Sequence, residues 1–255
     1  MIKSLDLSKS RKFNNLTKIN ILKEKKDIQY DKWPLEWKTI YYKAYPRMDQ
    51  ILLPKPISRK FDLYDSLLQR ESTRDFSKVK VNFQDCADLL YYSAGIKGIL
   101  KKDLSEKRMY PSAGGRYPLE VYIFSLNTEG LKEGAYHYHL KTHSLEEILL
   151  GPIYDKTIQQ FQQSWIRTTG LLIVVTAIFD RSEMKYGDRS YRHIMTEYGH
   201  MAQNLYLVGN SLGLGMCSIG GFCDDGLNEI LDIDGVTESV IGAIAVGAKK
   251  KKMIG

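Results

Sequence analysis

Two segments of this chain are apolar on both faces, and they limit its possible folds more than any other feature. Residues 119–126 and 170–179 are rich in β-branched and aromatic side chains and show no alternation with polar residues. A strand with one solvated face alternates, whereas a strand covered on both sides is apolar throughout. The two segments therefore predict central strands of a sheet with covered faces.

The remaining pattern predicts helices before and between strands. Leu63, Leu67 and Leu68 have helical spacing and predict a buried stripe on a helix over residues 61–69. Asn82 and Gly95 are suited to begin and end a second helix. The other expected helices cover 191–212, ended by Gly213, and 225–231, and the other expected strands cover 135–140, 144–149, 214–219 and 238–246. This order is typical of an α+β fold with one mixed sheet.

Residues 1–59 differ from the rest of the chain. They are polar and lysine-rich, yet include Trp33, Trp37 and several tyrosines. That much apolar area favours packing, so we expect an extended arm lying on a body formed by residues 60–255. A mobile leader is the alternative.

Charge and cysteine content exclude several classes of protein. Lys and Arg number 37 against 30 Asp and Glu, a formal charge of +7, which favours anionic ligands without identifying one. Much of the excess lies at the ends, in 18–26 and 249–252. The 3 cysteines form no CxxC pair, which favours a reducing cytoplasm over a disulfide framework. The longest apolar run, 170–179, is shorter than the roughly 20 residues that span a bilayer, so no membrane association is expected.

Arg70, Ser72 and Arg74 occupy alternate positions directly after the first predicted helix. In an extended segment alternate side chains share a side, so these three donors can converge on one anion. Solvent-exposed surface charge is the alternative explanation.

Two loops of small residues stand next to predicted strands. One is bounded by Pro111 and Pro118, and the other covers residues 218–222 with paired glycines. Small side chains let a flat ligand approach backbone N–H donors, although ordinary tight turns have the same composition. A G-x-G-x-x-G loop opening a helix is missing from the sequence, which excludes a Rossmann dinucleotide site.

Taken together, the motifs resemble the SagB-type, thiazole/oxazole-forming dehydrogenases of the nitroreductase superfamily. The resemblance covers roughly residues 50–248. It depends on ESTRDF at 71–76, PSAGGRYPLEVY at 111–122, GAYHYHLKTHSLEEI at 134–148, KYGDRSYRHIMTEYGHMAQNLYLVGNSLGLG at 185–215 and SIGGFCDD at 218–225.

The resemblance implies a nitroreductase-like fold, an intertwined homodimer and FMN as cofactor. It implies phosphate and ribityl contacts from Arg70, Ser72 and Arg74. It also implies that the loop of Ser112, Ala113, Gly114 and Gly115 reaches the flavin from the second subunit, and that Ile219, Gly220 and Gly221 face the ring. Lys249 matches a phosphate-binding position, with a solvated tail as the alternative. Gly115 stands where many relatives carry an asparagine.

Lys185 and Tyr186 match a Lys-Tyr pair, and the resemblance implies that this pair takes part in catalysis. Azoline oxidation removes a proton from Cα and a hydride from Cβ, so it needs a base. A desolvated lysine near other cations has a lowered pKa and can serve as that base. An exposed loop lysine beside a packing tyrosine is the alternative.

Histidines raise the possibility of a metal site. His137 and His139 alternate on a predicted strand and His143 follows, but no carboxylate or cysteine completes the set locally. We therefore expect no metal, and we expect His193 and His200 to make core or interface contacts.

These features favour an FMN-dependent oxidoreductase of peptide-derived substrates, most like an azoline-to-azole dehydrogenase in modified-peptide biosynthesis. The alternatives are an NAD(P)H-dependent nitro or quinone reductase and a non-catalytic subunit that docks a precursor peptide or a cyclase partner. Nucleic-acid binding is not expected, because no interleaved basic and aromatic patch occurs.

Overall fold

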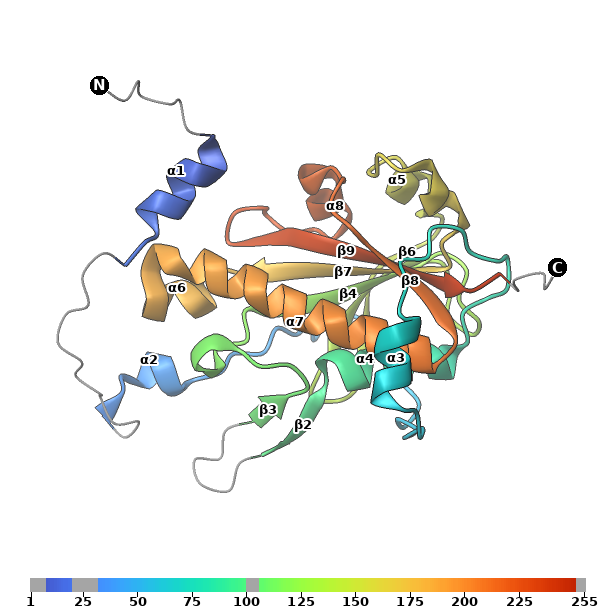
Figure 1. The fold of residues 1–255 in the computed structure, drawn as a ribbon, viewed down its shortest axis with the longest axis horizontal. Coiled ribbons are helices and arrows are strands. Elements are labelled where there is room, and N and C mark those ends of the chain that lie inside the picture. Colours follow the sequence, from blue (N-terminus) through green and yellow to red (C-terminus); the bar gives the residue numbers. More distant parts are fainter. Residues whose placement is uncertain (1–7, 20–31, 100–105, 251–255) are drawn as a thin grey trace.

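The computed structural model describes residues 8–19, 32–99 and 106–250 (Figure 1). The helices are α1 (Lys9–Leu16), α2 (Leu35–Lys38), α3 (Leu63–Gln69), α4 (Phe83–Ala94), α5 (Tyr154–Ile158), α6 (Asp180–Tyr186), α7 (Ser190–Ser211) and α8 (Asp224–Ile230). The strands are β1 (Gln50–Leu52), β2 (Ile96–Ile99), β3 (Glu106–Arg108), β4 (Leu119–Ser125), β5 (Gly134–His139), β6 (Ser144–Leu150), β7 (Leu171–Ile178), β8 (Leu214–Ile219) and β9 (Glu238–Ala248).

A seven-stranded sheet organises the body in the order β1-β6-β5-β4-β7-β9-β8. The two segments that are apolar on both faces are β4 and β7, which pair side by side near its centre from Leu119 opposite Ala177 to Ser125 opposite Leu171. Every residue of β4 is buried. The predicted central strands are thus confirmed.

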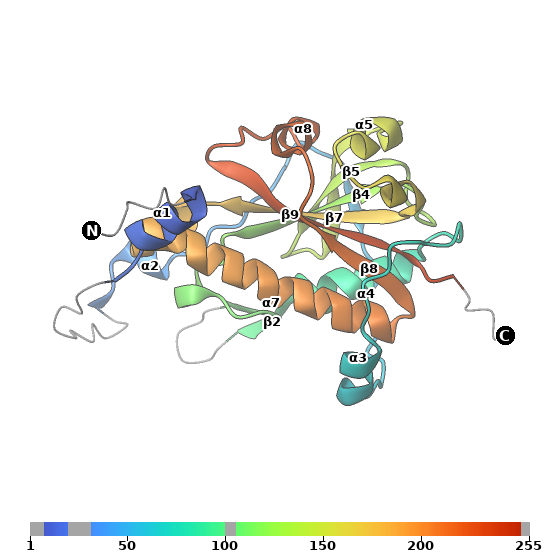
Figure 2. The ribbon, with the colours of Figure 1, turned by 45° about the horizontal axis from the view of Figure 1, so that its top comes forward.

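Helices cover both faces of this sheet. Figure 2 shows α4 and α7 on one side and α5 and α8 on the other. Along β4, Val121 and Ile123 belong to the core under α4 and α7. Tyr122 and Phe124 belong to the opposite core, which α5 and α8 close. Alternate side chains of one strand therefore enter two cores, and the predicted α+β class is confirmed.

The sheet is antiparallel rather than mixed. All its ladders are antiparallel, and parallel pairing occurs at isolated bridges such as Ser72 with Met216. Strands β4, β5 and β6 follow one another through short connections, which antiparallel pairing permits. Apolar runs without alternation are more typical of parallel strands, but helices cover both faces of this antiparallel sheet, so the runs did not reveal the strand direction.

The predicted helix boundaries hold where capping residues mark them. Asn82 accepts hydrogen bonds from the backbone N–H groups of Gln84, at 2.8 Å, and Asp85, at 3.4 Å, at the start of α4. At the other end of the main helix, Gly213 follows α7 with a φ of 72°. That left-handed conformation favours glycine and explains why the long helix stops there.

The predicted buried stripe on α3 is wrong within this chain. Leu63, Leu67 and Leu68 are 58%, 47% and 84% exposed, whereas Ser66 is buried. The Ser66 hydroxyl donates to the backbone carbonyl of Leu207 on α7 at 3.1 Å. The small serine face lets α3 approach the α7 backbone closely, and this contact turns the leucines outward.

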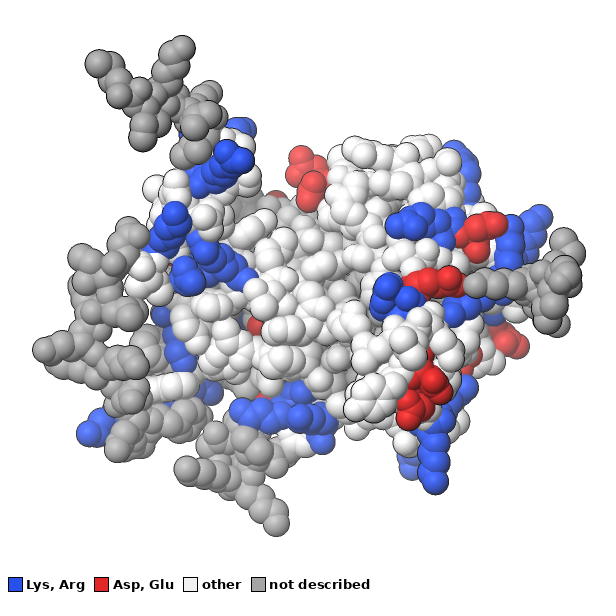
Figure 3. Space-filling view, viewed as in Figure 1, with Lys and Arg blue, Asp and Glu red and all other residues white. Residues whose placement is uncertain are grey.

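Part of the predicted arm packs against the sheet. Strand β1 pairs with the sheet edge at β6, and Lys43 and Tyr45 contact side chains of the sheet. The lysine-rich stretch at 20–31 lies outside the described residues. Charged side chains gather towards the ends of the molecule, with few over the middle of α7 (Figure 3). Among the described helices, none is long and apolar enough to cross a membrane.

Candidate functional site

The loop of small residues meets the predicted catalytic pair. Gly114 has a φ of +60°, and a Cβ placed on it would lie 2.8 Å from Lys185 Nζ and 2.4 Å from Tyr186 Oη. Lys185 and Tyr186 form the last turn of α6, not a loop, and both are half-buried. Only a glycine leaves room for both side chains at this point of the loop.

The antiparallel pairing of β4 with β7 explains this meeting. The loop leads into β4 at Leu119, and α6 leaves β7 after Ile178. Leu119 lies opposite Ala177 in the ladder. The beginning of one strand and the end of the other are therefore neighbours, and they bring together segments about 70 residues apart.

The surroundings of Lys185 favour an amine that loses its proton readily. Burial lowers the pKa of Lys185, and the nearby positive charge of Arg116 lowers it further. Burial raises the pKa of Tyr186, whose ring lies 4.7 Å from that of His193. The pair thus combines an amine destabilised as a cation with a phenol that keeps its proton.

Arg116 ties the loop to α6. It is 1% exposed, and its Nε donates to the backbone carbonyl of Arg181 at 2.7 Å. Its Nη1 donates to the carbonyl of Trp37 in the arm, also at 2.7 Å. Sequence reasoning missed this role, and its position directly after Gly114-Gly115 was the available signal.

The carboxyl group of Glu197 on α7 contacts the glycine loop at Ser112 and Ala113. It is 2% exposed. The Ser112 hydroxyl and the Ala113 backbone N–H donate towards its carboxyl group, but burial outweighs them and raises its pKa to about 8. Sequence reasoning missed Glu197. The signal was its position three residues after Ile194 and four before Met201, which places a carboxyl group within an apolar stripe. Lys185, Tyr186, Arg116, Glu197 and Gly114 are called the loop cluster below.

The predicted phosphate donors gather at the other end of α7. Arg70 stacks over the Tyr206 ring at 5.6 Å, and Ser72 bridges to Met216 in β8. Arg74 is exposed, with its Nη1 3.5 Å from the Ser72 carbonyl oxygen. Lys249 donates to Asn210 Oδ1 at 3.0 Å. Neither Arg70 nor Arg74 forms an ion pair with a carboxylate of the described residues, so both cations are available to an anion.

Strand β8 connects these donors to the second glycine loop. Gly215 packs against Thr73, where a Cβ would lie 2.7 Å from the threonine side chain. At the far end Ile219 is buried, and a Cβ on Gly220 would have no atom within 4 Å. The distance from Gly215 to Gly220 along a strand is about 16 Å. An anion-binding end and an open backbone end on one strand fit a flat ligand with a phosphate tail.

The loop cluster and the phosphate donors do not meet within one chain. Tyr186 contacts His193 and Lys249 contacts Asn210, which are 17 residues apart along α7. That separation is about 25 Å. Figure 1 shows α6 and α3 near opposite ends of this helix.

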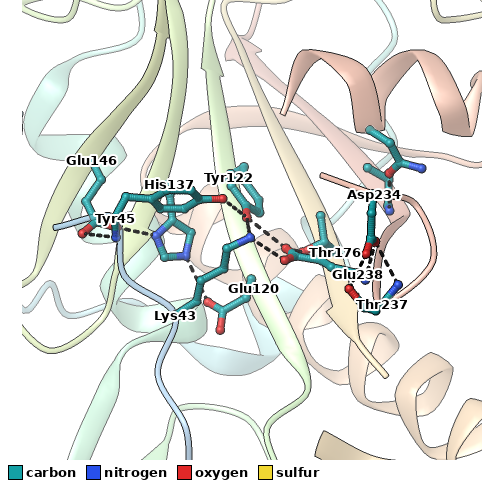
Figure 4. A network of polar contacts seen from close by, with 12 residues as sticks. Lys43, Tyr45, Glu120, Tyr122, His137, Glu146, Thr176, Asp234, Thr237 and Glu238 are labelled. Carbon is teal, nitrogen blue, oxygen red and sulfur yellow. Dashed lines mark hydrogen bonds and ion pairs between the residues drawn. The ribbon is translucent and has the colours of Figure 1, made fainter. Parts of the chain in front are cut away.

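His137 lies in a buried polar network instead of a metal site (Figure 4). Its Nδ1 is 2.7 Å from Glu146 Oε2 and its Nε2 is 3.1 Å from Glu120 Oε2. Arg181 donates to the other oxygen of Glu120 at 2.5 Å. These four residues are called the sheet network below. No group of three or more His, Cys, Asp or Glu in the described ranges has a metal-binding arrangement.

Comparison with known proteins decides which family has this arrangement. The model of the nitroreductase family matches residues 67–248, which include Arg70, Ser72 and Arg74, both glycine loops and the Lys185-Tyr186 pair; Lys249 lies one residue beyond the match. The chain belongs to the nitroreductase family. Membership of this family indicates an oxidoreductase and confirms the predicted nitroreductase-like fold.

Three curated relatives are similar in sequence. "Putative nitroreductase MJ1384" of Methanocaldococcus jannaschii is 32% identical over 72% of this chain and 91% of its own length. Trifolitoxin-processing protein TfxB of Rhizobium leguminosarum bv. trifolii is 28% identical over 55% of this chain and 39% of its own. Microcin B17-processing protein McbC of Escherichia coli is 30% identical over 51% of this chain and 50% of its own. The chain thus spans half or less of the two peptide-processing relatives.

A solved structure supports the same fold. The crystal structure of a "putative nitroreductase" from Anabaena variabilis superposes with a TM-score of 0.75 at 25% identity, covering 94% of this chain and 47% of that one. It supports the nitroreductase fold. The family match and the two peptide-processing relatives confirm the predicted resemblance to the SagB-type branch of the nitroreductase superfamily.

Proposed function

We propose that this nitroreductase-family chain is an FMN-dependent dehydrogenase of a peptide or amino-acid-derived substrate, most like an azoline-to-azole oxidase in modified-peptide biosynthesis. One observation carries the proposal: Lys185 and Tyr186 converge on Gly114 of the loop, where a Cβ would clash with both. The peptide-processing relatives TfxB and McbC support the substrate class.

The residues present fit FMN in two parts. Arg70, Ser72, Arg74 and Lys249 would hold the phosphate and ribityl chain, and Ile219, Gly220 and Gly221 would face the ring. When bound, FMN supplies a hydride acceptor. Because Ser112, Ala113, Gly114 and Gly115 lie at the far end of α7, a complete site requires the loop of a second copy. We therefore propose a homodimer.

Lys185 would accept the Cα proton of the substrate. Burial and the nearby positive charge of Arg116 disfavour the ammonium form and lower the pKa of Lys185, which increases the fraction of neutral amine that can accept a proton. Tyr186 keeps its proton and can donate a hydrogen bond to substrate, since its pKa is raised. The two side chains therefore have separate tasks, proton acceptance and orientation.

Replacing Lys185 with alanine tests the base. The variant should retain bound flavin while turnover of an azoline-containing peptide falls roughly 10²-fold or more. Lys156→Ala is the matched control, because Lys156 is exposed on α5 and pairs with Glu229. Full turnover by Lys185→Ala would sink the base assignment.

The cofactor site has its own test. Arg70→Ala and Arg74→Ala each remove one guanidinium facing the proposed phosphate, so the purified protein should lose the visible flavin absorbance. Lys250→Ala changes an exposed lysine that already pairs with Asp75 and should keep it. A wild-type protein that is colourless and takes up no FMN would instead favour a non-catalytic role in docking a precursor peptide or cyclase partner.

A nitro or quinone reductase using NAD(P)H is the second candidate. The observation in its favour is the 32% identity to "Putative nitroreductase MJ1384" over 91% of that protein. Rapid bleaching of the bound flavin by NADPH would favour the reductase, and a flavin that only the peptide substrate reduces would favour the dehydrogenase. For either reaction we propose a cytoplasmic protein.

A further inference from the structure

The amine of Lys185 lies against two indole rings of the N-terminal arm. Its Nζ is 3.3 Å from the centroid of the Trp33 ring and 5.2 Å from that of Trp37. The two indoles meet edge to face, with centroids 6.1 Å apart. A cation this close to aromatic faces is attracted by the ring quadrupole, and more strongly where water is excluded.

Hydrogen bonds from both sides hold this arrangement in place. The indole N–H of Trp37 donates to the backbone carbonyl of Met184, the residue before Lys185, at 3.2 Å. The carbonyl of Trp37 accepts from buried Arg116. One tryptophan of the arm is thus tied both to α6 and to the residue that follows the glycine loop, so the cage is part of the fold.

The same indoles line a cavity beside the loop. The cavity has a volume of about 290 Å³, and its wall combines Trp33, Trp37 and Ile40 of the arm with Ser112, Gly114 and Gly115. Flat rings on one side and glycine backbone on the other suit a small planar group. Lys185 on α6 does not line the cavity itself, but its amine contacts Trp33, Trp37 and Gly114, which do.

Two opposing influences therefore act on the Lys185 amine. Burial and Arg116 disfavour its charge, whereas the indole faces favour it. Tyr186 is the titratable neighbour on its own helix. The cavity wall adds the charged or titratable groups of Lys38, Glu106, Lys107 and Tyr117.

We propose that Trp33 and Trp37 are positioning residues for Lys185: the arm supplies an aromatic cage that holds the amine beside the cavity and stabilises its charge. This inference rests on the proposed function in taking Lys185 as the base. It makes the arm part of the working site, and it assigns to residues 33–37 the task of setting when the amine can accept a proton.

Substitution of Trp33 separates the cage from simple burial. Trp33→Leu keeps an apolar cover but removes the ring, and Trp33→Phe keeps a ring. Trp165→Leu is the matched control, since Trp165 packs with Phe76 on the opposite face of the sheet. Circular dichroism and thermal melts on the full-length variants establish that each one folds.

The readout is the rate at which an N-hydroxysuccinimide ester labels Lys185, followed by mass spectrometry across pH without any substrate. In Trp33→Leu the midpoint of the labelling curve should fall by roughly 0.5–1 pH unit. Trp33→Phe should move it less, and Trp165→Leu not at all. A midpoint that stays at its wild-type value in Trp33→Leu, or that rises as plain exposure would cause, overturns the cage.

Turnover assays then distinguish the two failures. If Lys185→Ala is inactive and Trp33→Leu labels like the wild type, the cage is wrong and the base assignment stands. If Lys185→Ala retains full turnover, the proposed base is wrong whatever the labelling shows. If the base and the cage are both correct, the acid side of the pH profile of turnover should move to lower pH in Trp33→Leu, as the labelling curve does.

Discussion

Two of the places where the molecule buries charge differ in how completely the charges are paired. In the sheet network, both ring nitrogens of His137 face carboxylates, and Arg181 contacts one of them. In the loop cluster, by contrast, one oxygen of Glu197 is buried without a hydrogen-bond partner among the described residues. Lys185 faces rings and another cation rather than a carboxylate.

This difference in pairing distinguishes the buried charges that stabilise the fold from the groups that can react. Buried charges that serve the fold are paired, because an unpaired one costs several kcal/mol. Groups left without a full set of partners have perturbed protonation and are available to a ligand, which is typical of functional sites. The paired charges of the sheet network stabilise the body. The loop cluster leaves groups without a full set of partners, which costs stability but keeps these groups available to react.

Removing His137, the cation shared by both carboxylates of the sheet network, should have the largest effect on stability. His137→Leu leaves Glu120 and Glu146 buried, and the latter without a cationic partner. We expect unfolding free energy to fall by about 3–5 kcal/mol, measured by urea denaturation at pH 6. His139→Leu, on the same strand but near the surface, should cost less than about 1 kcal/mol. Equal losses would show that the network is not special.

The pH dependence of this stabilisation has a definite sign. Burial opposes the charge of His137, but the two glutamates outweigh it and raise its pKa. The stabilisation is therefore complete below the ordinary histidine pKa and is lost as pH rises through the raised value. The gap between wild type and His137→Leu should narrow at alkaline pH.

The sequence reveals the frame of the molecule but not these pairings. The doubly apolar runs predict β4 and β7, and Asn82 and Gly213 predict helix ends, because each signal is local. His137 looked like a metal candidate without a local carboxylate. Its partners lie on the neighbouring strands, with Glu146 directly opposite in the ladder. Strand register decides the contact, and it depends on the whole sheet.

The candidate site divides in the same way. The residue types and alternate spacing of Arg70, Ser72 and Arg74 are enough to indicate an anion site, because the signal lies within five consecutive residues. The contact of Gly114 with Lys185 needed the antiparallel direction of β4 and β7, which burial patterns do not encode. Trp33 and Trp37 reach Lys185 from some 150 residues away, so no spacing rule could connect them.

Glu197→Gln tests the incompletely paired carboxyl group of the loop cluster. The raised pKa of Glu197, about 8, means that its contribution to stability is present at acid pH and is lost as pH rises towards that value. Glutamine cannot ionise, so the variant should gain roughly 4 kcal/mol relative to wild type between pH 5 and pH 9.

Urea midpoints at the two pH values measure this gain. Glu183→Gln, an exposed change on α6, should alter stability equally at both. A Glu197→Gln difference that is independent of pH would mean that the carboxyl group is already ionised at pH 5.

Gly114→Ala tests the contact at the centre of the loop cluster. Gly114 and Gly115 have φ values of +60° and +65°, so alanine at either position costs roughly 1–2 kcal/mol of backbone strain. Only at Gly114 would the new Cβ strike Lys185 and Tyr186. Gly114→Ala should therefore lose at least about tenfold more turnover than Gly115→Ala, with flavin absorbance retained in both. Equal turnover in the two variants would remove the contact from the mechanism.

The arm contacts both regions, and its anchoring should depend on the paired one. The Tyr45 hydroxyl lies 3.0 Å from that of Tyr122, and its backbone N–H donates to Glu146. Tyr45→Phe removes one hydrogen bond while Lys43 and Glu238 still contact Tyr122, so unfolding free energy should fall by only about 1 kcal/mol. Because the backbone anchor to Glu146 persists, Lys185 labelling should keep its wild-type midpoint. A shift there would mean that the sheet network and the loop cluster are coupled through the arm, and that the paired charges also set the protonation of the unpaired ones.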